Sequence, residues 1–281
     1  FVHYENGIIE MQKTGFRQGE EGRVSAALHY DIQTRGLRGS MDMENMDVAA
    51  LLALANQSEN RIAGRMTSAV QLGGTLDNPS IALTGEIAEG AFASYPLSDV
   101  ALDMELADRV LTLRHLSGTQ GSGSFSAVGT ADFDGMANVD IAASDIALGL
   151  FTTFAGVAED VTGTASLTAH IGGLTQNPEA DVKITAKNGG VNGASFDELT
   201  GEAQLRNSVI HLNGLTVTKY VDGVAYQASA RGTLPLRALR AEHDEVLSAY
   251  EQFDLTFALD NADLSLLPVF SKQVSGARRA A

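Results

Sequence analysis

Residues 72–85 read LGGTLDNPSIALTG, and the fold can be worked out from this segment. The same design returns 99 positions later, where residues 171–184 read IGGLTQNPEADVKI. Glycine and Asn-Pro fix turns, and the phase of the apolar residues decides which side of a strand points inward. Because both recur together, one supersecondary unit occurs twice in tandem. We expect an elongated body in which each unit covers the open end of its neighbour.

Apolar and polar residues alternate along both copies, which is typical of strands with one apolar and one solvated face. Ile81 and Leu83, for example, alternate with Ser80, Ala82 and Thr84. The pattern predicts a mostly β chain, with about six strands in each unit. The predicted inward positions, which are the candidate lining of an apolar surface, are Val70, Leu72, Ile81, Leu83, Val100, Leu102, Met104, Leu106, Leu111, Leu113, Leu167, Ile171, Val182, Ile184, Leu199, Leu205, Ile210, Leu212, Leu255, Phe257 and Leu259.

Short helices are expected between the copies. Asp47, Asp145 and Asp263 each precede apolar residues at helical spacing, as an N-cap residue does at the start of an amphipathic helix. A charged insertion at 236–250 also carries apolar residues at helical spacing and predicts an additional surface helix.

The repeat predicts four parts of one continuous body. We expect the latter part of a truncated repeat at 1–45, a repeat with a leading helix at 46–144, a second repeat at 145–262, and the start of another at 263–281. The chain begins at Phe1 rather than at Met, so we expect a piece of a longer protein, with any anchor or export signal outside it.

Composition disfavours several classes of partner. A net charge of −16 repels phosphate backbones and anionic lipid surfaces, so we expect no nucleic-acid partner. The absence of cysteine excludes disulfides, thiolate nucleophiles and cysteine zinc sites. Aromatic residues make up only 6% of the chain and Trp is absent, so the apolar surface is aliphatic and poor in the anchors of protein interfaces.

Catalytic and metal motifs find no support in the sequence. The six histidines are scattered without metal-ligand spacing, and no nucleophile elbow, P-loop or HExxH motif is present. Asp132, Asp134 and Asp140 form a loose acidic group without the spacing of calcium β-rolls, which favours simple turn chemistry. We expect no enzyme activity, no cofactor and no metal.

The repeated Gly-Gly, Asn-Pro and alternating apolar pattern of residues 72–85 and 171–184 resembles the TamB family of the AsmA-like superfamily. The resemblance implies a long sheet folded into an open hydrophobic trough. It also implies a periplasmic protein of a diderm bacterium, anchored in the inner membrane by a segment outside this chain. The implied partners are phospholipid and an outer-membrane β-barrel of the assembly-factor type. The implied role is lipid transport between the membranes, or help in outer-membrane protein assembly and secretion.

Physical reasoning leaves three ways to hide a continuous aliphatic face: a closed sandwich, a coiled β-helix or an open trough. In a trough, acyl chains cover what protein does not, and each buried methylene gains about 0.8 kcal/mol. The competing interpretations are an assembly module that offers strand edges to a client, and a structural β-solenoid with a closed core and parallel coils.

Overall fold

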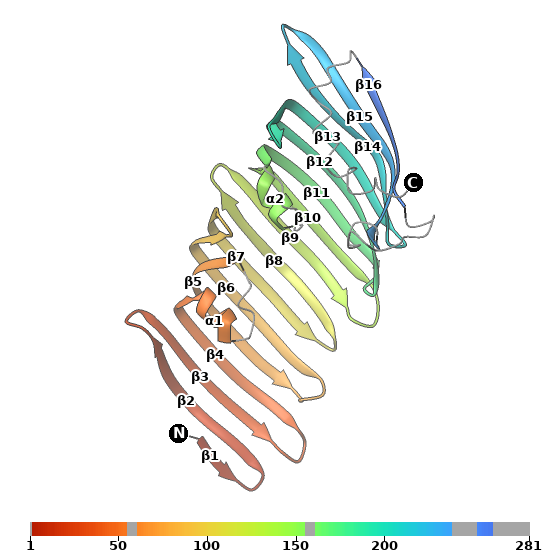
Figure 1. The fold of residues 1–281 in the computed structure, drawn as a ribbon. Helices are drawn as coiled ribbons and strands as arrows, with labels where there is room; N and C mark the ends of the chain where they lie inside the picture. The colour runs from red at the N-terminus through yellow and green to blue at the C-terminus, as the bar shows by residue number, and fades with distance from the viewer. Residues whose placement is uncertain (1, 55–60, 155–160, 238–251, 261–281) are drawn as a thin grey trace, which may run out of the picture. The chain divides into compact units, whose positions relative to one another are not determined.

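One open antiparallel sheet dominates the described part of the chain. The computed structural model describes residues 2–54, 61–154, 161–237 and 252–260 (Figure 1). These residues form sixteen strands whose order in the sheet follows their order in the sequence, from β1 to β16. The chain divides into two compact units, unit 1 (residues 1–139) and unit 2 (residues 140–281). The predicted mostly β chain with short helices is therefore confirmed, whereas the predicted alternative of parallel solenoid coils is wrong, because consecutive strands pair antiparallel.

Unit 1 consists of hairpin-connected strands and one helix that interrupts them between β4 and β5. Its elements are β1 (Val2–Glu5), β2 (Ile8–Gln18), β3 (Gly22–Asp31), β4 (Gly36–Asp47), α1 (Val48–Leu54), β5 (Ile62–Gly74), β6 (Pro79–Phe92), β7 (Tyr95–Ala107), β8 (Val110–Gln120) and β9 (Gly123–Asp132). The following strand, β10 (Ala137–Ala147), contains the division between the units.

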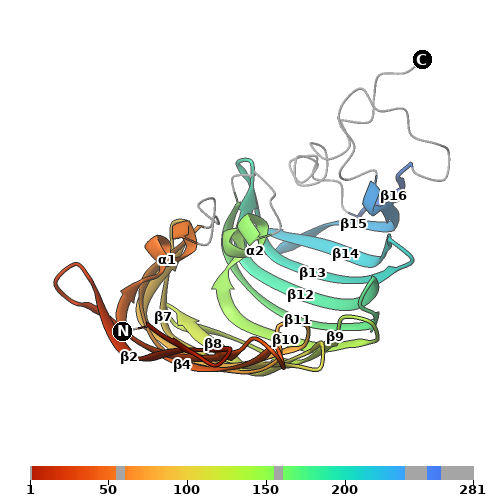
Figure 2. The ribbon, with the colours of Figure 1, turned by 90° about the horizontal axis from the view of Figure 1, so that it is seen from below.

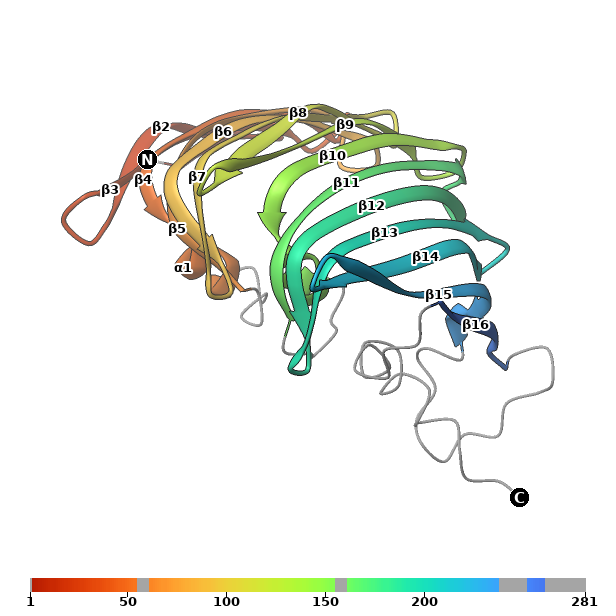
Figure 3. The same cartoon turned by 90° about the horizontal axis from the view of Figure 1, so that it is seen from above.

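Unit 2 repeats the arrangement. Figure 3 shows β11 to β15 side by side, each bent along its length. The elements of this unit after β10 are α2 (Leu148–Phe154), β11 (Val161–Leu174), β12 (Asn177–Val191), β13 (Ala194–Arg206), β14 (Val209–Val221), β15 (Val224–Pro235) and β16 (Asp254–Asp260).

The repeat in the sequence is also a repeat in the structure. Six strands separate α1 from α2, as the sequence predicts. The bounds of β7 and β13 differ by 99 positions at both ends. Most of the predicted insertion helix at 236–250, and all of the expected next repeat at 263–281, lie outside the described residues. The predicted boundaries of the parts remain predictions.

The first hairpin of each copy uses the predicted glycine. Gly74 and Gly173 both have φ of 79°, a left-handed conformation that glycine adopts without strain. The turn in the first copy is closed by a hydrogen bond of 3.0 Å from the Thr75 amide to the Asn78 carbonyl. The Gly-Gly and Asn-Pro pairs thus hold β5 against β6 and β11 against β12 in matching registers.

The predicted helix cap at Asp47 is confirmed. Helix α1 begins directly after it, and the Asp47 Oδ1 accepts a hydrogen bond of 3.2 Å from the Ala50 amide.

The predicted helix cap at Asp145 is wrong, because β10 continues to Ala147. Asp145 instead adopts a left-handed φ of 53° inside the strand, and its amide donates to the Ser166 hydroxyl at 3.1 Å. Asn45 does the same in β4, with φ of 52° and a bond of 3.3 Å to the Thr67 hydroxyl. Asp and Asn tolerate this conformation better than other non-glycine residues, which explains why they occupy it. The third predicted cap, Asp263, lies outside the described residues.

Candidate functional site: an aliphatic sheet face

In unit 1 the strand register gathers the predicted lining residues on one side of the sheet, because directly paired residues of antiparallel strands point to the same side. Val100 and Leu102 lie on that side of β7, in phase with Met104. One cross-strand row consists of Leu72, Ile81, Leu106 and Leu111. The adjacent row consists of Val70, Leu83, Met104 and Leu113. We call this surface the apolar face of unit 1.

The apolar face of unit 1 extends over strands that the sequence reading did not include. Leu72 pairs with Gly39, and the row continues through Leu28 to Met11. Val70 pairs with Met41, which lengthens the adjacent row in the same direction. The apolar face therefore crosses β2 to β8.

Unit 2 carries an equivalent surface, the apolar face of unit 2. All predicted lining residues of this unit belong to it, again in cross-strand rows. The rows contain Ile171, Leu205 and Ile210; Val182, Leu212 and Leu255; Leu167, Ile184 and Phe257; and Leu199 and Leu259. The structure thus brings together the predicted residues within each unit.

Protein covers these faces only in part. Among the predicted residues, Val70 is buried, whereas Phe257 and Leu259 are 42% and 39% exposed. The others are half-buried. Extensive contacts between described elements join neighbouring strands, or join the helices to β4, β5 and β11. Within the described ranges, each unit is therefore a single sheet layer with an aliphatic face that has no second sheet packed on it.

The two helices cover one end of the apolar face of their own unit. Helix α1 contacts β4 and β5, and α2 contacts β11; Figure 2 shows both helices. Leu51 of α1 packs against the cluster of Met43, Met46 and Val70. Leu148 and Phe151 of α2 pack against a cluster that contains Ala165, Phe196 and Val217. Each described helix has seven residues, too few to cross a bilayer.

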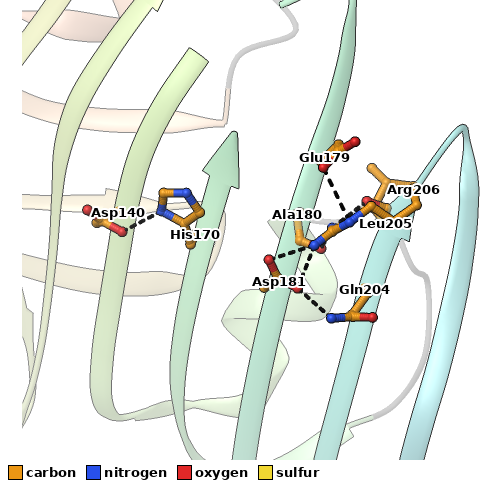
Figure 4. A network of polar contacts seen from close by, with 8 residues as sticks. All are labelled: Asp140, His170, Glu179, Ala180, Asp181, Gln204, Leu205 and Arg206. Atoms are coloured by element: carbon orange, nitrogen blue, oxygen red, sulfur yellow. Dashed lines mark hydrogen bonds and ion pairs between the residues drawn. The ribbon is translucent and has the colours of Figure 1, made fainter. Parts of the chain in front are cut away.

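The opposite face of the sheet is polar and carries ion pairs. In unit 2 the Arg206 guanidinium lies 2.8 Å from an Asp181 oxygen and 3.3 Å from a Glu179 oxygen (Figure 4). Hydrogen bonds from Arg206, which have the larger effect, and from Gln204 lower the pKa of the Asp181 carboxyl. On β11 the His170 Nδ1 lies 2.8 Å from an Asp140 oxygen. These contacts leave charges paired at the surface and in water.

The loose acidic group divides between a turn and this surface. The Asp134 amide donates to Asp132 Oδ1 at 2.9 Å, and the Arg109 guanidinium binds Asp134 and lowers the pKa of its carboxyl. The predicted turn chemistry is confirmed for these two aspartates, whereas Asp140 lies on β10 and contacts His170 of β11. Among the described residues, no group of three His, Cys, Asp or Glu side chains is arranged to hold a metal.

A hollow of about 1080 Å³ in unit 1 is lined mainly by residues of the polar face, and also by Met43, Ser68, Gly85 and Leu102 of the apolar face. Its floor contains Ser25, Ala69 and Thr84, and an ion pair of 3.3 Å between Lys13 and Asp42 lies at its margin.

Besides the residues of β2 to β4, sequence reasoning missed a polar member of the apolar face, Ser68. It occupies an inward position of β5, between Met66 and Val70, and pairs with Met43 on one side and Gly85 on the other. The signal was present in the sequence, since Ser68 stands in phase with the apolar residues of its run.

Comparisons with protein families, curated proteins and solved structures find no match for the chain. The candidate site is therefore defined by its geometry and chemistry.

Proposed function

We propose that the chain is a non-enzymatic segment of a TamB-like protein that carries phospholipid acyl chains along its apolar faces. The observation that carries the proposal is the aliphatic face of a single sheet layer, half-exposed in both units. Under the resemblance noted above, the setting is the periplasm of a diderm bacterium. The lipid moves between the inner and outer membranes, and the membrane anchor belongs to a segment outside this chain.

The energetics favour hydrocarbon as the ligand. An acyl chain gains about 0.8 kcal/mol for each methylene that it buries, which sums to about ten kcal/mol for a long chain. Leu, Val, Ile and Met supply most of this surface, while Trp is absent from the chain. Aliphatic contacts have no directional preference, so a chain held by them can shift from one row to the next at little cost.

The repeat favours a conduit over a pocket for one ligand. Each unit supplies the same kind of cross-strand rows, and each helix covers only one end of them. We propose that the rows of each unit line an open trough, so that every unit binds acyl chains in the same way.

The test is a charge placed in the lining. Leu83 is half-buried in the middle of β6, between Val70 and Met104. Leu83→Asp should lower both the phospholipid that co-elutes with the purified protein, measured by mass spectrometry, and lipid transfer between vesicles. A carboxylate among hydrocarbon must be desolvated and has no partner there.

Thr185→Asp is the matched control, because Thr185 is exposed on the polar face of β12 between Ser166 and Thr200. It should bind and transfer lipid as the unchanged protein does. Circular dichroism should show the same strand content for both variants. If Leu83→Asp retained lipid and transferred it at the original rate, the proposal would be wrong.

A second candidate function is the docking of an outer-membrane β-barrel of the assembly-factor type. It is favoured by the sheet edges, because β1 and β16 each pair with only one described strand. Exposed edge groups can pair with a strand of another protein. Photo-crosslinkers at Tyr4 and at Thr256 should capture such a barrel, whereas a crosslinker at Thr185 should not. Equal capture at all three positions would remove the support for docking by a strand edge.

A further inference from the structure

Ser68 is a polar residue buried within the apolar face of unit 1. Ser68 is only 6% exposed, and its Oγ has no hydrogen-bond partner. Buried hydroxyl groups are nearly always paired, so an exception calls for an explanation. A serine hydroxyl offers one donor and two acceptor positions, all unused here.

Ser68 has an apolar side chain beside it on β4 and a glycine beside it on β6. It pairs with Met43 of β4, and Val70 follows on the same strand face. On the other side it pairs with Gly85, which adds no side chain to the face. A Cβ built on Gly85 would lie 3.3 Å from the Ser68 Cβ, so even a methyl group would fill this gap tightly.

The second copy has no such group. The residue 99 positions after Ser68 is Leu167, and the residue 99 positions after Gly85 is Ile184. These two side chains lie opposite each other in β11 and β12. At these two equivalent positions, unit 2 has two paired aliphatic side chains, whereas unit 1 has a serine hydroxyl beside a glycine.

We infer that Ser68 donates a hydrogen bond to the carbonyl oxygen at the head of an acyl chain bound to the apolar face of unit 1. This inference rests on the proposed function. The carbonyl is the acceptor that an acyl lipid carries next to its hydrocarbon, so a chain lying along the aliphatic rows brings one to this depth. Ser68 thereby selects acyl lipids over hydrocarbon that lacks a carbonyl.

Helix α1 packs on the cluster next to Ser68. Leu51 packs on the cluster of Met43, Met46 and Val70, which surrounds Ser68 in the register. A helix of seven residues is not stable by itself in water, so α1 keeps its place through this packing. An acyl chain offers the cluster equivalent contacts, and α1 shifts as the carbonyl reaches the hydroxyl.

The experiment compares an ester lipid with its ether analogue. Dipalmitoyl phosphatidylethanolamine has the carbonyls, and dihexadecyl phosphatidylethanolamine has the same headgroup and chain length without them. Affinity for each is measured by competition with a fluorescent fatty-acyl probe. The unchanged protein should bind the ester lipid about three- to tenfold more tightly, the value of one hydrogen bond.

Ser68→Ala should remove this preference by weakening ester binding alone, while Thr185→Ala should leave it intact. Ser68→Ala loses an unpaired buried hydroxyl, so its melting temperature should equal or exceed that of the unchanged protein. A loss of ester binding in this variant therefore does not come from misfolding.

Binding of both lipids without preference, or a preference that survives Ser68→Ala, would overturn the inference and leave the proposed function standing. Failure of the unchanged protein to bind either lipid would overturn both.

Discussion

The pairing of Gly189 with Phe196 allows a substitution whose cost follows from the geometry. Gly189 of β12 lies directly opposite Phe196 of β13, and the Phe196 ring is only 2% exposed in the cluster beneath α2. A Cβ at Gly189 would lie 2.7 Å from the ring Cε2 and 2.9 Å from Cε1, closer than packed carbons approach. The φ of Gly189 is not left-handed, so Gly189→Ala changes the sterics alone.

The Phe196 ring has to move into a cluster that is already filled. Overpacking of this kind costs about 1–3 kcal/mol of unfolding free energy. For a protein of this size, that corresponds to a fall in melting temperature of about 2–5 °C, measured by circular dichroism or calorimetry. Replacing Phe196 by Leu in the Gly189→Ala background should make the combined loss smaller than the sum of the two single losses.

Gly214→Ala is the matched control. Gly214 lies in β14 with a φ that is not left-handed, and a Cβ there would meet nothing within 4 Å. Its melting temperature should be unchanged or slightly higher, because alanine has fewer unfolded conformations than glycine. The steric argument fails if Gly189→Ala and Gly214→Ala melt at the same temperature.

Two further predictions concern α1 and the ion pairs. Asp47→Ala removes the acceptor for the Ala50 amide and should lower the unfolding free energy by about 1 kcal/mol in urea titrations. Asp47→Ser should retain most of the stability that the cap contributes. Equal urea midpoints for Asp47→Ala and the unchanged protein would contradict the role of the cap. Arg206→Gln removes the main cause of the lowered Asp181 pKa. Because the folded pKa lies below the unfolded value of about 3.9, the stabilisation is present above that pH and is lost as the pH falls through the folded pKa. The stability difference between the unchanged protein and Arg206→Gln should therefore be constant from pH 7 to about pH 5 and should narrow in acid, and a difference that grows below about pH 4 would contradict the assignment.

The apolar faces were predictable because two sequence signals agree. The alternation of Ile81 and Leu83 fixes the inward side of β6, and the recurrence of the glycines and Asn-Pro fixes the register of each copy. A strand that alternates correctly in a known register can place its side chains on only one side.

Local irregularities were not predictable from the same signals. Asp145 stands before an apolar run, as Asp47 does, yet Asp145 is a left-handed strand residue and Asp47 is a helix cap. The choice depends on the partner strand, where the Ser166 hydroxyl receives the Asp145 amide. Pairing of Gly189 with Phe196 likewise depends on register near the strand end, which composition does not reveal.

Ser68 shows a different limit. Its inward phase is visible in the sequence, but whether a serine finds a partner within its own strand is decided only by the packing around it.

The strand order of the sheet has a consequence for how the chain is made. Every strand from β2 onward pairs with the strand that precedes it in the sequence. Each strand thus finds its partner next to it in the sequence, and most connections are short hairpin turns, which keeps the cost in conformational entropy low. A polypeptide that emerges slowly from a translocation pore or a ribosome can add each new hairpin to a finished edge without waiting for its far end. Biogenesis of such a molecule can be progressive, and its length can change by whole hairpins without rewiring what has already formed.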